Sequence, residues 1–257
     1  MLRVWLGTSW KMTKTLAEAR AWTSAVTAVP VPDGVEAFVL PSHTALSAVR
    51  DAVPSGHRLR VGAQDAHWSD GPERTGEVSV AQVRDAGASL VEVGHSERRL
   101  GLGEDDALVA RKARAVLDGG LTLLLCVGET AEVRAGGGHR RHVAGQVRSA
   151  LAALRPEQAA SVVVAYEPVW SIGVDGRPAA PTDVAPVVDA LRAALTDLAS
   201  GVDVPVLYGG SVDPANAEAL LDTGVDGLFV GRAAWEPGGY LALLDLVAQR
   251  AGRRVTQ

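Results

Sequence analysis

The stretch Val162-Val163-Val164-Ala165-Tyr166-Glu167-Pro168 decides the fold class of this chain. Its five leading apolar residues lack polar alternation, which is typical of a parallel strand buried on both faces. Seven similar runs recur along the chain, at 4–7, 35–40, 59–63, 90–93, 121–127, 204–208 and 227–230. The sequence therefore predicts eight buried parallel strands, several of which lead directly into polar residues.

Longer stretches with apolar residues at helical spacing lie between these runs. They span residues 16–29, 105–117, 144–154, 183–199, 215–221 and 239–249. Ser79, Thr182 and Asp213-Pro214 fit helix starts, where a side-chain cap or a proline suits the free amide groups. Alternating strand–helix units with right-handed crossovers are typical of a closed barrel. We therefore expect an α/β fold, a single (β/α)8 TIM barrel that forms one domain over residues 1–257.

An open doubly wound sheet is the alternative architecture. Such sheets carry a G-x-G-x-x-G motif after the first strand when they bind dinucleotides. The residues found there are Gly7-Thr8-Ser9-Trp10-Lys11, which do not match that motif. The closed barrel is therefore favoured.

Composition restricts the partners of the chain. Its formal net charge is −5 and its pI about 5.7, so we expect no broad basic surface for nucleic acid or anionic lipid. Cys126 is the only cysteine, which excludes an internal disulfide and a multi-cysteine metal site. No run is long enough to span a membrane, and the opening MLRVWLGTSWKM is interpreted as a strand rather than a signal peptide. We expect a cytoplasmic protein without nucleic-acid or membrane partners.

Functional residues of such barrels lie at the carboxyl ends of the strands and in the following loops. Glu167 comes directly after a strand and before Pro168, which stiffens the exit of the strand. It is either a solvated charge or a base, and the glycine-rich segment 171–176 behind it favours a mobile lid. The strand ends carry no His/Asp/Glu cluster with metal-ligand spacing, so we expect neither a metal nor a cofactor.

A histidine and a lysine complete the set of reactive groups. His95 opens a helical turn after a strand, and the helix N-terminus there keeps the ring neutral by disfavouring added positive charge. Lys11, after the first strand, is either a surface lysine or the positive charge that an anionic substrate needs. Glu97 fits an ion pair as well as it fits catalysis.

Glycine-rich loops follow the last two strands. Tyr208-Gly209-Gly210-Ser211-Val212 ends one strand and Val230-Gly231-Arg232 ends the other. Glycine lets backbone amides approach a phosphate, and the start of the next helix adds its positive end. Two such loops after consecutive late strands match the usual phosphate site of these barrels.

The chain resembles the triosephosphate isomerase family over almost its whole length. The most specific shared blocks are Gly94-His95-Ser96-Glu97-Arg98-Arg99 and Ala165-Tyr166-Glu167-Pro168-Val169-Trp170. The other matches, in order along the chain, are Trp10-Lys11-Met12, Val61-Gly62-Ala63-Gln64, Thr75-Gly76-Glu77, Cys126-Val127-Gly128-Glu129-Thr130, Ile172-Gly173, Tyr208-Gly209-Gly210-Ser211-Val212 and Asp226-Gly227.

This resemblance implies an activity and the residues that carry it. In triosephosphate isomerase itself a glutamate is the base and a neutral histidine the electrophile, and these established roles fall on Glu167 and His95. Glu167 would move a proton between neighbouring carbons of a small sugar phosphate, while His95 and Lys11 stabilise the enediolate oxygens.

The resemblance also implies a phosphate site and an assembly. Gly173, Ser211 and the Gly231 region would offer backbone amides to the phosphate, and the loop 168–179 would close over the substrate and exclude water. Thr75 resembles the tip of a long loop that inserts into a neighbouring subunit, which implies a homodimer.

Three positions depart from the usual pattern of the family. Ser9 and Asp65 stand where asparagines are usual, and Arg232 replaces the second of two glycines after the last strand. Arg232 would either add a charged fork to the phosphate or point to solvent. The lid also resembles a slightly lengthened version of the usual loop.

These departures, together with His67-Trp68 and Trp235, are similar to a branch of the family that acts on tetrulose phosphates. That branch converts L-erythrulose 1-phosphate to D-erythrulose 4-phosphate in erythritol catabolism, and the small side chain of Ser9 would make room for the extra hydroxymethyl group. The first alternative is the glycolytic interconversion of dihydroxyacetone phosphate and glyceraldehyde 3-phosphate. The second is a barrel that binds a three- or four-carbon sugar phosphate without turnover.

Overall fold

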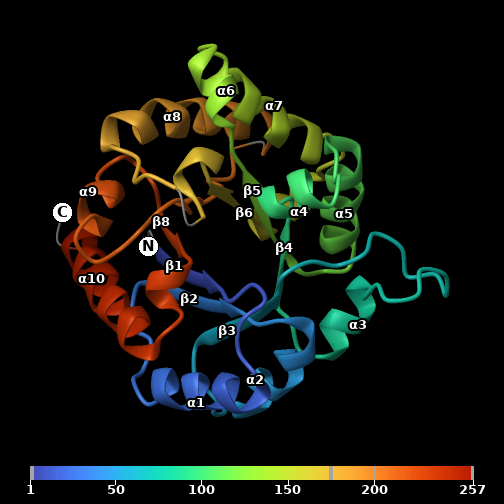
Figure 1. The fold of residues 1–257 in the computed structure, drawn as a ribbon, viewed down its shortest axis with the longest axis vertical. Coiled ribbons are helices and arrows are strands. Elements are labelled where there is room, and N and C mark those ends of the chain that lie inside the picture. Colours follow the sequence, from blue (N-terminus) through green and yellow to red (C-terminus); the bar gives the residue numbers. More distant parts are fainter. Residues whose placement is uncertain (1–2, 174–175, 200, 256–257) are drawn as a thin grey trace.

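The structure, a computed structural model, describes residues 3–173, 176–199 and 201–255. Within these ranges eight parallel strands close into a barrel in chain order, with helices around the outside (Figure 1). The strands are β1 (Val4–Ser9), β2 (Val35–Leu40), β3 (Leu59–Ala63), β4 (Leu90–Val93), β5 (Thr122–Val127), β6 (Val162–Tyr166), β7 (Val206–Tyr208) and β8 (Gly227–Val230). The predicted (β/α)8 barrel is confirmed, and β7 is shorter than predicted because Pro205 has no N–H for the ladder.

The helices of the described residues form the outer ring seen in Figure 1. They are α1 (Leu16–Thr27), α2 (Leu46–Ala52), α3 (Val80–Asp85), α4 (Ser96–Gly101), α5 (Asp106–Asp118), α6 (Ala131–Ala135), α7 (His139–Ala150), α8 (Pro181–Leu198), α9 (Ala217–Leu221) and α10 (Pro237–Val255). The six predicted helical stretches all overlap members of this ring, but α2 and α6 were not foreseen, because five to seven residues are too few to establish helical spacing.

Of the three predicted helix starts, one is confirmed by the structure and two are wrong. The Ser79 side chain accepts the amide hydrogen of Gln82 and caps α3, as predicted. The prediction of Thr182 as the start of α8 is wrong, since the helix begins at Pro181. Asp213-Pro214 also does not start α9, because the Asp213 carboxylate accepts from Ala215 N in the turn before the helix.

The apolar core has two layers, separated by the barrel wall. The outer layer packs strands against helices, and the inner layer fills the barrel with residues that include Phe38, Leu40, Leu90, Leu124 and Phe229. Side chains alternate between these layers along each strand. In β4, Leu90 belongs to the inner layer while Val91 and Val93 belong to the outer one, so alternation directs Glu92 into the barrel.

Asp65, one of the unusual residues, belongs to a buried ionic cluster after β3. Lys112 Nζ on α5 lies 2.9 and 2.7 Å from the two Asp65 carboxylate oxygens and 2.5 Å from Glu104 Oε1. Arg98 Nη2 contacts the same two acids, at 2.8 Å from Asp65 and 2.7 Å from Glu104. The aspartate thus gives the buried ammonium a second anionic partner and ties the β3–α3 loop to α5.

Lys112→Met should destabilise the chain by about 3 kcal/mol, because it leaves two buried carboxylates without their main cation. Urea unfolding followed by circular dichroism measures the loss. Arg114→Met is the matched control on the same helix: Arg114 and Asp118 form an exposed pair, so it should cost less than about 1 kcal/mol. Equal losses in the two variants would contradict a structural role for the cluster.

Candidate functional site

A cavity of about 240 Å³ opens where the carboxyl ends of the strands meet. All nine residues predicted for the site line this cavity. They are Ser9, Lys11, His95, Glu97, Glu167, Gly173, Ser211, Gly231 and Arg232. They come from loops and strand ends that are widely separated in the sequence, so the barrel closure brings them together. Their individual roles stay predictions.

The backbone of neighbouring strands and loops packs closely against Glu167 and fixes its position. Its amide hydrogen bonds to Val127 O at 2.8 Å, which continues the ladder between β6 and β5 past the end of the strand. A Cβ on Gly128 would come within 1.9 Å of the Glu167 carbonyl oxygen, and one on Gly209 within 2.7 Å of Glu167 Cγ. The two glycines are therefore required for the carboxylate to reach the cavity. Glu167 Oε2 is buried and has no hydrogen-bond partner among the described residues.

His95 is held as a neutral hydrogen-bond donor. It is the N-cap of α4, and its Nδ1 accepts the amide hydrogen of Glu97 at 3.1 Å. A ring that accepts at Nδ1 carries its hydrogen on Nε2 when neutral, and Nε2 lies 3.8 Å from Glu167 Oε2. Burial, aided by the positive charge of Lys11, lowers the pKa of His95 to about 4. The imidazole therefore remains uncharged at neutral pH, as the helix N-terminus predicted.

Lys11 reaches the cavity through an unusual backbone conformation. Its φ of 52° lies in the left-handed region, and its carbonyl oxygen accepts from Gln64 Nε2 at 3.0 Å. Lys11 Nζ lies 2.6 Å from Glu97 Oε1. Of the two interpretations left open for Glu97, the structure contains the ion pair, in which the acid positions the ammonium at the cavity wall.

The glycine-rich loops form the other part of the cavity wall. Ser211 N donates to Ser171 Oγ at 3.3 Å, which joins the loop after β7 to the one after β6. Arg232 Nη2 donates to the carbonyl oxygen of Gly173 at 2.7 Å. The arginine therefore bridges the loop after β8 to the predicted lid, a contact that neither of its two expected orientations included. Val174 and Asp175 of that lid lie outside the described residues.

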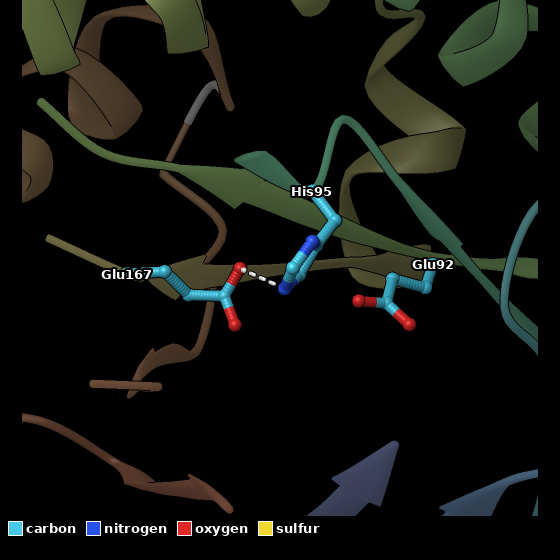
Figure 2. A group of neighbouring side chains, drawn as sticks. All are labelled: Glu92, His95 and Glu167. Atoms are coloured by element: carbon cyan, nitrogen blue, oxygen red, sulfur yellow. Dashed lines mark ion pairs between the residues drawn. The ribbon is translucent and has the colours of Figure 1, made fainter. Parts of the chain in front are cut away.

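Glu92 is the member of the site that the sequence reading missed. It is 3% exposed and lies in the run 90–93, whose apolar residues predict only a buried strand. Figure 2 shows His95 between the carboxyl groups of Glu92 and Glu167, and one ligand atom from each of the three lies within 4.8 Å of the others. A charged residue in the middle of a run buried on both faces was the signal that could have revealed it.

Three such groups could hold a cation, but the tautomer of His95 opposes it. The nitrogen that faces Glu167 is Nε2, which carries the ring hydrogen because Nδ1 accepts from Glu97. A metal needs a lone pair on the ligating nitrogen. The arrangement therefore suits hydrogen-bond donation from His95 and proton transfer by the carboxylates.

Burial makes both carboxyl groups reluctant to ionise. It raises the pKa of Glu167 to about 8, with the charge of Glu92 as the next cause, and raises the pKa of Glu92 to about 7. Because the two groups are so close, they lose their protons in steps that belong to the pair. A carboxyl with a pKa near neutrality is well matched to taking and returning a proton.

The barrel holds a buried carboxyl group, a neutral imidazole and a lysine beside glycine-rich loops. This arrangement is typical of proton-transferring enzymes that act on anionic substrates. The sequence profile of the triosephosphate isomerase family matches residues 4–247. The chain belongs to that family, whose members isomerise small sugar phosphates.

Several relatives in this family are similar along nearly their whole length. The L-erythrulose-1-phosphate isomerase of Mycolicibacterium smegmatis is 46% identical over 255 residues, which cover 96% of this chain and 94% of the relative. The enzyme of the same name from Rhizobium meliloti is 44% identical, with 96% and 97% covered, and that from Brucella abortus is 44% identical, with 97% and 98% covered.

Glu92→Gln should shift the pH profile of kcat/KM to lower pH. Only the carboxylate form of Glu167 accepts a proton, so kcat/KM of the native chain should rise with pH up to about 8. Removing the charge of Glu92 lowers the pKa of Glu167, because like charges disfavour each other's ionisation. Initial rates measured at a series of pH values between pH 5 and pH 9 give the profile.

Glu97→Gln is the matched control for this shift, since the charge of Glu97 is the weaker of the two acidic influences on Glu167. It should move the profile less than Glu92→Gln does. If the pH profile of kcat/KM is the same in Glu92→Gln as in the native chain, the electrostatic coupling of the two buried carboxyl groups is contradicted.

Proposed function

We propose that this chain isomerises L-erythrulose 1-phosphate to D-erythrulose 4-phosphate. The observation that carries the proposal is the buried pair of Glu167 and His95, with Oε2 and Nε2 at 3.8 Å in a cavity that Lys11 also lines. The four-carbon substrate is inferred from relatives of that name at 46% and 44% identity. In this proposal the catalytic residues are Glu167, His95 and Lys11.

The reaction moves a carbonyl by one carbon without any external oxidant. The Glu167 carboxylate takes the proton from C3, and the C–H electron pair forms the C2=C3 double bond of an enediolate. The negative charge that develops on O2 is stabilised by the hydrogen on His95 Nε2 and by the Lys11 ammonium. Glu167 then returns the proton to C2, O3 gives up its proton to O2, and C3 becomes the carbonyl carbon. The proton removed from C3 returns to C2 and no electrons leave the substrate, so this reaction requires no redox cofactor.

In this proposal the loops after β6, β7 and β8 bind the phosphate of the substrate. Gly173, Ser211 and Gly231 line the cavity there, and their amides are the proposed phosphate donors. Arg232, held by the Gly173 carbonyl, would bring positive charge to the same end. Closure of the loop 168–179 would exclude water and protect the enediolate from losing its phosphate.

Two other functions use the same groups. Turnover of dihydroxyacetone phosphate in glycolysis is favoured by the presence of Lys11, His95 and Glu167, which suffice for a triose. A barrel that only binds a sugar phosphate is disfavoured, because burial of two adjacent carboxyl groups is costly and serves proton transfer better than binding. A place in erythritol catabolism remains a prediction that follows from the four-carbon substrate.

The substrate proposal predicts that kcat/KM is at least tenfold higher for L-erythrulose 1-phosphate than for dihydroxyacetone phosphate (roughly the discrimination expected of one well-placed hydrogen bond). Coupled assays with the purified chain measure both constants. A higher value for dihydroxyacetone phosphate would overturn the four-carbon assignment in favour of the glycolytic one, and no turnover of either compound would favour the binding barrel.

We further propose a cytoplasmic homodimer in which residues 1–257 form one domain. Residues 70–77 of the loop between β3 and α3 are exposed, and Figure 1 shows this loop projecting away from the barrel. Met12, next to the active-site Lys11, is fully exposed, which suits an apolar contact with a second copy. Among the described residues, no helix is both long and apolar enough to cross a membrane.

Thr75→Arg should shift the chain from dimer to monomer and lower its activity, because the loop that would enter the partner then carries a bulky charge. Sedimentation velocity measures the mass. Thr182→Arg, the same change at an exposed residue of α8, should leave the mass unchanged. A native chain that sediments as a monomer would contradict the dimer.

A further inference from the structure

A serine and a glutamate from distant strands meet beside the reactive groups. Ser9 ends β1 and Glu92 lies in β4, and Ser9 Oγ donates a hydrogen bond to Glu92 Oε2 at 2.9 Å. The contact is buried and joins residues 83 positions apart. Both side chains lie at the top of the barrel interior, where the apolar filling gives way to the cavity.

Burying the carboxyl group of Glu92 at this position costs folding free energy. The interior below it is filled by leucine, phenylalanine and valine side chains, and a leucine would fill the same volume at no electrostatic cost. Within the described residues no lysine or arginine forms a salt bridge with Glu92, while the nearby Lys11 is paired with Glu97. Its other contact is Cys126 Sγ, 3.7 Å from Oε1. A buried acid supported only by a serine and a thiol is expected where it serves a ligand.

The hydrogen bond also fixes how Ser9 faces the cavity. The hydroxyl hydrogen is directed to Glu92, so the lone pairs of Ser9 Oγ remain to accept a hydrogen bond. The backbone of Ser9 is held on the other side, because Trp235 Nε1 donates to its carbonyl oxygen at 2.9 Å. Ser9 lines the cavity and Glu92 does not, so the serine presents to the ligand an acceptor that the carboxylate has polarised.

The position of the pair matches the part of a four-carbon substrate that a triose lacks. A phosphate at the loops after β6, β7 and β8 places the reacting carbons at Glu167 and His95. The substrate carbon beyond them then meets the remaining cavity wall, which includes Ser9, Lys11 and Trp235. In L-erythrulose 1-phosphate that continuation is a hydroxymethyl group, whereas in dihydroxyacetone phosphate it is a hydrogen atom.

We propose that Ser9 and Glu92 form a hydroxyl-recognition pair, in which Ser9 Oγ accepts the hydrogen of the substrate's terminal hydroxymethyl group and Glu92 orients and polarises that serine. This inference rests on the proposed four-carbon substrate and assigns its selection to two residues. Ser9 is then a specificity-determining contact, and Glu92 is a positioning residue that acts through it. A triose leaves the acceptor without its partner, and a polar group left unpaired in a closed site is the main means by which enzymes reject an analogue that lacks a hydroxyl.

The test is a comparison of kcat/KM for L-erythrulose 1-phosphate and dihydroxyacetone phosphate in the full chain and its variants. Ser9→Ala and Glu92→Leu should lower the value for the four-carbon substrate by about 10- to 100-fold, the range for a hydrogen bond to a charge-polarised group. Both values are compared at pH 9, where Glu167 is largely ionised with or without the charge of Glu92. At that pH the value for dihydroxyacetone phosphate should change by less than about threefold, because a triose has no terminal hydroxymethyl group to bond to Ser9. Glu92→Gln should keep most of the preference, because its amide oxygen can still accept from Ser9.

Thr8→Val is the matched control. Thr8 is the neighbouring residue in β1, it is fully buried, and its hydroxyl has no hydrogen-bond partner among the described residues. Its loss should leave the ratio of the two kcat/KM values unchanged. The retained preference of Glu92→Gln separates positioning of the serine from a merely structural effect of the leucine variant.

The outcomes separate this inference from the function on which it rests. A native chain that prefers dihydroxyacetone phosphate overturns the proposed function and the recognition pair together. A native chain that prefers the four-carbon substrate, with Ser9→Ala and Glu92→Leu that retain this preference, overturns the pair alone. Equal losses on both substrates would also overturn it, since the residues would then act on the reaction rather than on the hydroxymethyl group.

Discussion

Closure of the barrel is the constraint on which the rest of the molecule depends. Once β1 pairs with β8, every strand has an outer face covered by helices and an inner face covered by other strands. Only the last inward-facing residues of the strands, and the loops behind them, can meet a small molecule. Ser9 holds such a position at the end of β1, Glu167 follows β6 directly, and His95 and Lys11 lie two residues beyond β4 and β1. Glu92 faces the barrel interior from β4 and bonds to Ser9 without lining the cavity. Because Glu92, His95 and Glu167 are buried there, these three ionisable groups act in a poorly solvated environment.

Poor solvation gives the site its chemistry. It keeps His95 neutral, so that Nε2 carries a hydrogen to donate, and it raises the pKa of Glu167 to about 8. The same burial would be prohibitive for an isolated carboxylate such as Glu92 without hydrogen-bond partners. Ser9 and Cys126 provide them, which turns the departure from asparagine at position 9 into part of a two-residue arrangement rather than a simple gain of space.

Much of this molecule could be predicted from its sequence. The eight strands follow from runs without polar alternation, and the grouping of Glu167, His95 and Lys11 follows from their places after strands. Contacts between distant strands could not be predicted, because no local pattern encodes them. Glu92 was hidden inside an apolar run, and the bond from Arg232 to the Gly173 carbonyl depends on how two loops approach one another. The capping of α8 and α9 was mispredicted because neighbouring aspartates satisfy the free amides in different ways.

The central claim is that Glu167 carries the proton between two carbons of a four-carbon sugar phosphate. Its most direct measurement is proton NMR of L-erythrulose 1-phosphate incubated with the chain in deuterium oxide. Deuterium should replace the hydrogen at C3 of the recovered substrate or appear on the product carbon that was C2 of the substrate, and the exchange should vanish in Glu167→Gln, whose amide cannot accept the proton. Exchange that persists undiminished in Glu167→Gln, or no exchange with the native chain, would contradict the account.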